Sequence, residues 1–137
     1  MGLKDSFGRN LNIDKKSKKL YDDILSGLCF QGFEKKYVFM LSLALAYNRK
    51  LKPKKIERYP LLNTESFSRK DVWLMAAVAV EHTGSLSILN DLNEVRKIAE
   101  EYAMAGLQEL KSLIDDNGSG DNFLSVIEVE SRKRLNK

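Results

Sequence analysis

The least polar stretch of the chain runs from Tyr37 to Tyr47, and Ser42 is its single polar residue. A helix over this stretch is apolar on nearly every face, so other elements must surround it. The run from Val72 to Val80 is apolar without interruption, which predicts a second enclosed helix. Spanning a bilayer takes about 20 consecutive apolar residues, and both runs are much shorter. We therefore expect two central buried helices and no membrane span.

Local start and stop signals place these helices and their neighbours. Asp14 can cap a first helix of about a dozen residues, which follows a stretch without a clear period. Ser68, with Asp71 three residues later, matches a capping box and predicts where the second buried helix begins. Gly84 supplies the stop signal for that helix.

A third strong pattern begins at Leu92, after a cap at Asn90 or Asp91. Apolar residues then recur at three- and four-residue spacing over about 25 residues, as in a long helix. Gly106 lies within it, and a glycine there indicates that another helix packs closely. A short last helix is expected from about Asp121, followed by a basic tail.

These elements predict an all-α protein, a single compact domain of four or five helices that spans residues 1–137. Residues 1–13 and 132–137 are expected to be mobile ends. Hydrophobic content of 43% and charged content of 31% are close to the averages of globular proteins. The single cysteine, Cys29, cannot form an internal disulfide, and no secretory leader is recognised, so a reducing cytoplasm is the expected location.

Charge divides the chain into two halves of opposite sign. Residues 1–70 hold 16 Lys/Arg against 7 Asp/Glu, a net charge of +9, whereas residues 71–137 hold 7 against 12, a net charge of −5. Such asymmetry favours an acidic partner for the first half, with nucleic acid as the commonest candidate. A merely solvated surface, or association between the oppositely charged halves, explains the same pattern.

The most basic segment extends from Arg49 to Arg58 and contains one acid, Glu57. Pro53 and Pro60 exclude a continuous helix, so we expect a long exposed connection, part of which is pinned to the body as a short extended piece. Clustered cations with an interleaved tyrosine suit phosphate contact and base stacking. Together with the first helix, this segment gives the candidate nucleic-acid-binding residues: Arg49, Lys50, Lys52, Lys54, Lys55, Arg58, Tyr59, Lys15, Lys16, Lys18 and Lys19.

A helix-turn-helix interpretation is disfavoured. The segment that would act as recognition helix, Ser85 to Val95, has no Lys or Arg and carries Asp91 and Glu94, which would repel phosphates. The candidate DNA contacts therefore stay with the basic connection and the first helix, with the basic tail of Arg132, Lys133, Arg134 and Lys137 as a further candidate.

No catalytic, cofactor-binding or metal-binding pattern is recognised. One His and one Cys are too few for the usual zinc sets, and no glycine-rich phosphate loop or nucleophile elbow is present. His82 falls in the last turn of its helix, where an imidazole suits the helix dipole. We expect a protein that is not an enzyme and needs no cofactor.

Several patterns together resemble a known family. They are Phe33-Glu-Lys-Lys-Tyr-Val-Phe-Met-Leu, Tyr47-Asn-Arg and, far downstream, Ile98-Ala-Glu-Glu-Tyr-Ala-x-x-Gly. Over about residues 33–115 the chain is similar to small accessory proteins encoded beside the prokaryotic Dnd system, which carries out DNA sulfur modification (phosphorothioation). This resemblance implies a prokaryotic host and a role in DNA modification or defence, and it implies no catalytic residues.

Two functions follow as hypotheses. The first is a non-enzymatic accessory protein that binds DNA through its basic first half. The alternative is a protein-interaction or homo-oligomer subunit that does not bind nucleic acid.

Overall fold

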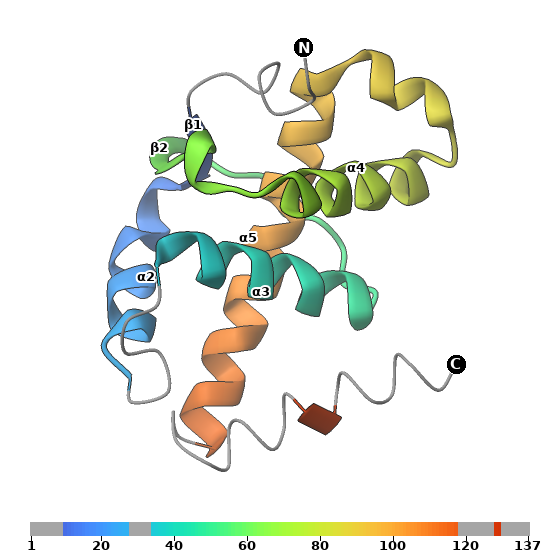
Figure 1. The fold of residues 1–137 in the computed structure, drawn as a ribbon. Coiled ribbons are helices and arrows are strands. Elements are labelled where there is room, and N and C mark those ends of the chain that lie inside the picture. Colours follow the sequence, from blue (N-terminus) through green and yellow to red (C-terminus); the bar gives the residue numbers. More distant parts are fainter. Residues whose placement is uncertain (1–9, 28–33, 118–127, 130–137) are drawn as a thin grey trace.

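A computed structural model describes residues 10–27, 34–117 and 128–129 (Figure 1). Cys29, the helix predicted from Asp121 and the basic tail lie outside these residues, apart from a helical pair at 128–129. The elements, with η for short 3-10 helices, are β1 (Asn10–Asp14), η1 (Lys15–Ser17), α2 (Lys18–Leu25), α3 (Lys35–Asn48), β2 (Arg58–Asn63), η3 (Thr64–Ser66), α4 (Arg69–Thr83), η4 (Leu86–Asn90) and α5 (Leu92–Asn117).

The long helix α5 is the spine of the fold. Figure 1 shows α3 and α4 crossing α5 on one side, with α2 and the two short strands near the N-terminal end of α3. The most extensive packing between elements joins α3 to α5. The fold is mainly helical, as expected.

The prediction of an all-α fold is wrong in one respect, because β1 and β2 form a small antiparallel sheet. Leu11 is opposite Leu62 and Ile13 is opposite Tyr59, with an irregularity in register after Leu11. Pro60 lies at this irregularity, where its missing amide hydrogen does least harm to the ladder. Residues 10–13, where the sequence shows no clear period, belong to strand β1, while the short extended piece expected within the basic connection is confirmed as β2.

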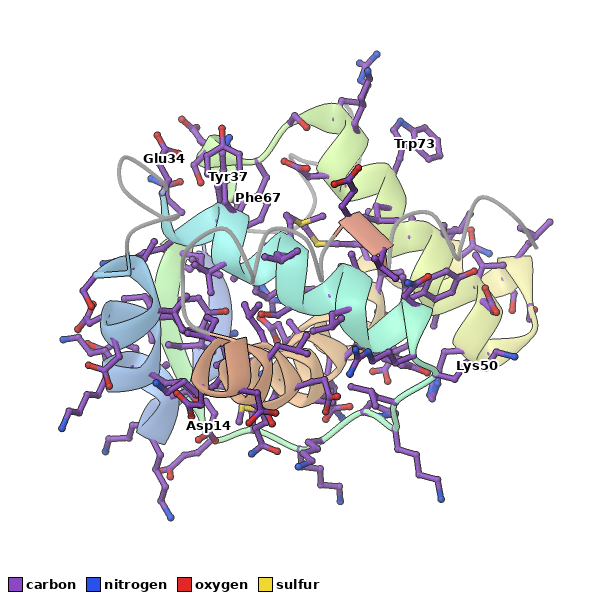
Figure 2. The ribbon with its side chains drawn as sticks, turned by 90° about the horizontal axis from the view of Figure 1, so that it is seen from below. Asp14, Glu34, Tyr37, Lys50, Phe67 and Trp73 are labelled. Carbon is purple, nitrogen blue, oxygen red and sulfur yellow. The ribbon has the colours of Figure 1, made fainter. Side chains whose placement is uncertain are left out.

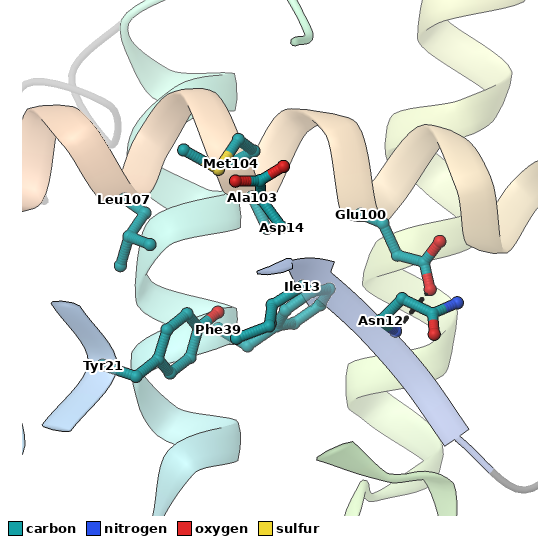
Figure 3. Close-up of a pocket in the computed structure, with 9 residues that line it drawn as sticks. All are labelled: Asn12, Ile13, Asp14, Tyr21, Phe39, Glu100, Ala103, Met104 and Leu107. Atoms are coloured by element: carbon teal, nitrogen blue, oxygen red, sulfur yellow. Dashed lines mark hydrogen bonds between the residues drawn. The ribbon is translucent and has the colours of Figure 1, made fainter. Parts of the chain in front are cut away.

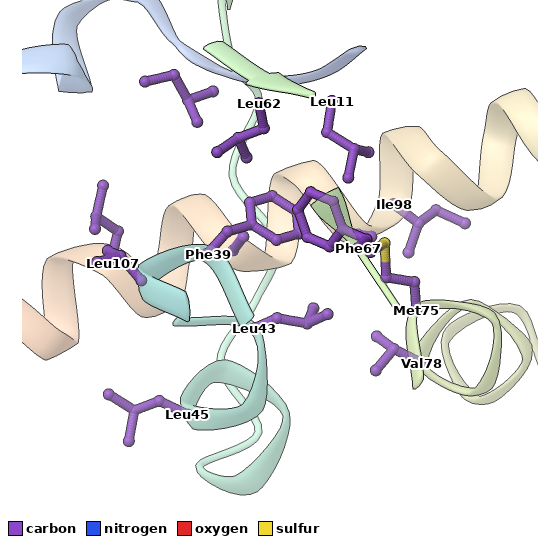
Figure 4. Close-up of a cluster of buried hydrophobic side chains, with 14 of the residues drawn as sticks. Leu11, Phe39, Leu43, Leu45, Leu62, Phe67, Met75, Val78, Ile98 and Leu107 are labelled. Carbon is purple, nitrogen blue, oxygen red and sulfur yellow. The ribbon is translucent and has the colours of Figure 1, made fainter. Parts of the chain in front are cut away.

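In the part of the chain that the structure describes, the core lies where the two strands meet α2, α3, α4 and α5. Its largest fully buried side chains include Tyr21 from α2, Phe39 from α3 and Leu110 from α5. The rings of Phe39 and Phe67 meet edge to face, with centroids 5.7 Å apart (Figure 4), a favourable arrangement for an aromatic pair. No helix among the described residues is long and apolar enough to cross a membrane.

The two apolar helices are less enclosed than their sequences predict. Tyr37, in the first turn of α3, is 49% exposed. On α4, Trp73 is 55% exposed and Leu74 is 36% exposed. Complete enclosure is therefore wrong for both helices, because α3 and α4 lie across one spine and each keeps an outer side. Figure 2 shows Trp73 projecting away from the body.

The helix boundaries follow their sequence signals. At the start of α4 the Ser68 hydroxyl accepts from the Asp71 amide at 3.1 Å and the Asp71 carboxylate accepts from the Ser68 amide at 2.9 Å, which confirms the capping box. Gly84 ends α4 in the left-handed conformation, with φ of 71°. The Asp91 carboxylate accepts from the Glu94 amide at 3.2 Å, so Asp91 rather than Asn90 caps α5.

Gly106 fixes the crossing of α5 and α3. A Cβ atom placed on Gly106 would lie 1.7 Å from the carbonyl oxygen of Ser42, so the backbones touch where a side chain would otherwise be. The Ser42 hydroxyl is buried and donates to the Val38 carbonyl at 2.7 Å, within its own helix. The close packing predicted at Gly106 is confirmed.

Replacing Gly106 with alanine should destabilise the fold by about 3 kcal/mol, because the clash is with backbone that cannot move without displacing α3. The free energy of unfolding in urea measures this. Gly84→Ala is the matched control: its added Cβ meets nothing within 4 Å, so its cost is about 1 kcal/mol for the left-handed backbone alone. Equal losses in the two variants would contradict the role given to the crossing.

Candidate nucleic-acid interface

The basic connection between α3 and β2 lies against the spine of the fold. Figure 2 shows it passing α5 on the side opposite α3, between Lys50 at one end and Asp14 at the other. The Lys54 amide donates to the Glu101 carbonyl of α5 at 3.0 Å. The Lys54 ammonium also donates to the Gln108 side chain. The expected exposed connection is thus attached along α5, while its lysine side chains stay exposed.

The structure brings the end of this connection beside the start of the first helix. The Lys15 amide donates to the Glu57 carbonyl at 2.8 Å, and the Glu57 amide donates to the Asp14 carboxylate at 2.8 Å. The other carboxylate oxygen of Asp14 accepts from the Lys16 amide at 3.2 Å. Asp14 therefore caps η1, as predicted for the first helix, and also holds two distant basic segments together.

Nine of the eleven candidate residues have exposed cationic side chains on these segments. We call this set the basic surface: Lys15, Lys16, Lys18, Lys19, Lys50, Lys52, Lys54, Lys55 and Arg58. The β1–β2 pairing places residues 10–14 beside residues 58–63 and so brings the two segments together where Lys15 meets Glu57. Charge clustering in the sequence identified both segments, but the pairing that joins them was not predicted.

Arg49 and Tyr59 are already engaged within the fold. Arg49 forms an ion pair with Glu109 of α5, and its side chain is only 27% exposed. Tyr59 is half-buried against the core, and the Lys18 ammonium lies 5.5 Å from the centre of its ring. Arg49 therefore serves the α3–α5 packing, and Lys18 would have to move before a base could stack on that face of Tyr59.

A buried carboxylate lies beneath the sheet. Glu100 is 2% exposed and accepts from the Asn12 amide of β1 at 2.5 Å (Figure 3). Burial raises the pKa of Glu100, while the Asn12 hydrogen bond and the positive charges of Arg96 and Arg58 oppose that rise. Beside it is a cavity of about 10 Å³, room for about one water molecule. The positive charge of Arg58 therefore acts on Glu100 as well as adding to the basic surface.

A second arrangement of polar side chains, missed by sequence reasoning, lies near Lys50. An open cleft of about 260 Å³ is lined by residues from the end of α3, the end of α4 and the middle of α5: Tyr47, Lys50, Leu51, Val78, Glu81, His82 and Tyr102. The Tyr47 hydroxyl donates to Glu81, and His82 Nδ1 is 2.8 Å from the Tyr102 hydroxyl. Burial, and then the charge of Glu81, raises the pKa of Tyr102.

Lys50 occupies an unusual backbone conformation at the rim of this cleft. Its φ is 55°, and among the described residues no other non-glycine has a positive φ. The Leu51 amide donates to the Ala46 carbonyl at 2.9 Å and the Lys50 amide to the Tyr47 carbonyl at 3.2 Å, which together form a Schellman cap. Glycine is usual at this position, and a side chain there costs about 1–2 kcal/mol.

No group of three or more His, Cys, Asp or Glu residues that could hold a metal ion is found in the part of the chain that the structure describes. The features that the fold does offer are exposed cations on two joined segments and, at Lys50, a cleft lined by aromatic, polar and apolar residues. These define a small, mainly helical protein with a basic surface.

Comparison with known proteins identifies the family. A family model described as "DNA sulphur modification system-associated protein 4" matches residues 13–137. The chain belongs to this family, which confirms the resemblance drawn from residues 33–115 and extends it over β1's end, η1 and α2. No curated protein and no solved structure matches the chain.

Proposed function

We propose that this protein is a non-enzymatic accessory of the DNA sulphur modification system that binds DNA through phosphate contacts on its basic surface. The observation that supports this most is the direct hydrogen bond between Lys15 and Glu57, which joins two lysine-rich segments separated by about 40 residues of sequence. Exposed lysines on two adjoining segments suit the phosphate backbone, because each contact releases condensed counterions.

Asp14, an acid beside this surface, is engaged by the backbone of the chain. Both carboxylate oxygens of Asp14 accept backbone amides, from Lys16 and from Glu57. Such bonds stabilise the local chain and reduce the repulsion that a free carboxylate would exert on a phosphate. Lys52 and Lys55 have exposed side chains on the connection, so they are the cations best suited to test the proposal.

Reversing both charges in a Lys52→Glu/Lys55→Glu variant should weaken binding to a labelled duplex by about tenfold or more at moderate salt. It should also reduce the slope of log affinity against log salt by about 2, because two phosphate contacts are lost. Fluorescence anisotropy titrations at several salt concentrations measure both quantities. Circular dichroism should show an unchanged fold.

The matched control is Arg69→Glu/Lys70→Glu, which makes the same change in net charge at the exposed start of α4, outside the basic surface. This variant should keep most of the affinity and the salt slope. Equal losses in both variants would mean that only overall charge matters, and an unchanged affinity of the first variant would remove the connection from the DNA site.

A second candidate function is self-association, and the exposed Trp73 favours it. Trp73 and Leu74 together give α4 an apolar outer side, and tryptophan is enriched at the energetic centres of protein interfaces. Pairing between the basic and acidic halves of two copies would add electrostatic complementarity to such a contact.

Trp73 is the only tryptophan of the chain, so its fluorescence reports on this surface alone. If copies associate through α4, the mass from light scattering should rise with protein concentration and the emission should shift to shorter wavelength. Trp73→Ala should abolish the rise in mass. A constant mass, with emission typical of exposed tryptophan at every concentration, would exclude self-association through this side of α4.

A further inference from the structure

The cleft beside Lys50 combines groups that a simple anion site would not. Lys50 supplies a positive charge at the rim, whereas Glu81 places a carboxylate among the lining residues. Glu81 already accepts from the Tyr47 hydroxyl, and a carboxylate has acceptor positions to spare. A matching ligand therefore carries hydrogen-bond donors in one part and negative charge in another.

The walls of the cleft are aromatic and apolar. The rings of His82 and Tyr102 meet edge to face, with centroids 5.4 Å apart, and the hydrogen bond between them fixes their relative orientation. Val78 and Leu51 add apolar surface. Aromatic walls of this kind suit a flat heteroaromatic ring such as a nucleobase. Any of the bases can stack on them, because every base has a π-face.

The volume limits the size of the ligand. At about 260 Å³, the cleft is below the range of pockets that hold drug-sized molecules. It can hold one planar ring system with a charged group at its rim, but no long stretch of nucleic acid.

The left-handed backbone of Lys50 also supports a ligand site at the cleft. The Schellman cap of α3 would accommodate glycine without strain, yet the chain has a lysine there, with its side chain at the cleft. A strained position that carries a charged group at a cleft is typical of a functional site.

We propose that this cleft binds a single nucleotide, with its base against Tyr47, His82 and Tyr102 and its phosphate at Lys50. The inference rests on the proposed function where the nucleotide belongs to bound DNA, because the basic connection leads from Lys50 along α5. An unpaired nucleotide at a DNA end or gap could then leave the phosphate track and enter the cleft. A free mononucleotide offers the same chemistry.

Two labelled duplexes test whether the cleft binds a nucleotide of bound DNA. One duplex is blunt, and the other has a single unpaired 2-aminopurine nucleotide at its end. The wild-type protein should bind the second duplex about tenfold more tightly, the expected effect of stacking one base. The 2-aminopurine emission should be quenched on binding. Free 2-aminopurine deoxynucleoside monophosphate tests whether the cleft binds a free mononucleotide, because binding should quench its emission in the same way.

His82→Ala is the main variant, because His82 is exposed and lies outside the basic surface. It should abolish the preference for the unpaired nucleotide and the quenching, yet leave blunt-duplex affinity within about twofold. Lys50→Gly should weaken binding of the free mononucleotide while retaining the fold, since glycine suits the left-handed cap. Asn93→Ala, at an exposed position of α5 outside the cleft, should behave as wild type.

Equal binding of both duplexes by the wild-type protein, without quenching, would overturn the cleft proposal and leave phosphate binding by the basic surface intact. Quenching of the free mononucleotide without binding of either duplex would support the cleft and overturn DNA binding. Binding of neither duplex nor mononucleotide would overturn both. Preference and quenching that persist in His82→Ala would also overturn the cleft proposal, since the base would then stack elsewhere.

Discussion

The backbone contact between Gly106 and Ser42 is the constraint on which the other features depend. With no side chain at Gly106, α3 can lie directly on α5, and this packing is the most extensive between any two elements. Once α3 is fixed, its end places Arg49 beside Glu109 and starts the basic connection on its path along α5. A displaced α3 would carry Tyr47 and Lys50 away from Glu81 and His82 of α4, and the residues that line the cleft would separate.

The connection and the small sheet extend that constraint to the surface. Lys54 is attached to α5 through its amide, and β2 then pairs with β1 before the chain enters η3. Glu100 supports β1 from below through the Asn12 amide. A buried carboxylate is costly unless hydrogen bonds and nearby positive charge compensate for lost hydration, and Arg96 and Arg58 supply that charge. The segments that carry the lysines of the basic surface are therefore held by hydrogen bonds to α5 and by the β1–β2 pairing.

Much of the helical fold could be predicted because its signals are local. The capping box at Ser68, the left-handed Gly84 and the close approach at Gly106 all follow from residue types at fixed positions. The sheet was missed although Leu11 and Ile13 alternate with polar residues, because five residues give too short a pattern and their partner lies about 50 residues away. The exposed outer sides of α3 and α4 were not predicted, because an apolar run does not reveal how many neighbouring elements cover it.

The candidate site, like the fold, has some features that a local sequence pattern predicts and others that depend on long-range contacts. Lysine clusters are visible in the sequence, and they identify most of the basic surface. The engagement of Arg49 by Glu109 and the pairing of His82 with Tyr102 depend on contacts between residues 60 and 20 positions apart, which no local pattern contains. The unusual backbone of Lys50 also had no signal, because lysine is seldom found where glycine is favoured.

The affinity for a labelled duplex between about 50 and 200 mM salt tests phosphate binding by the basic surface most directly. With about four phosphate contacts, the affinity should fall about a hundredfold over this range, and log affinity should be linear in log salt. Absence of binding at 50 mM, or an affinity that does not change with salt, would contradict the proposal and direct the search to a protein partner.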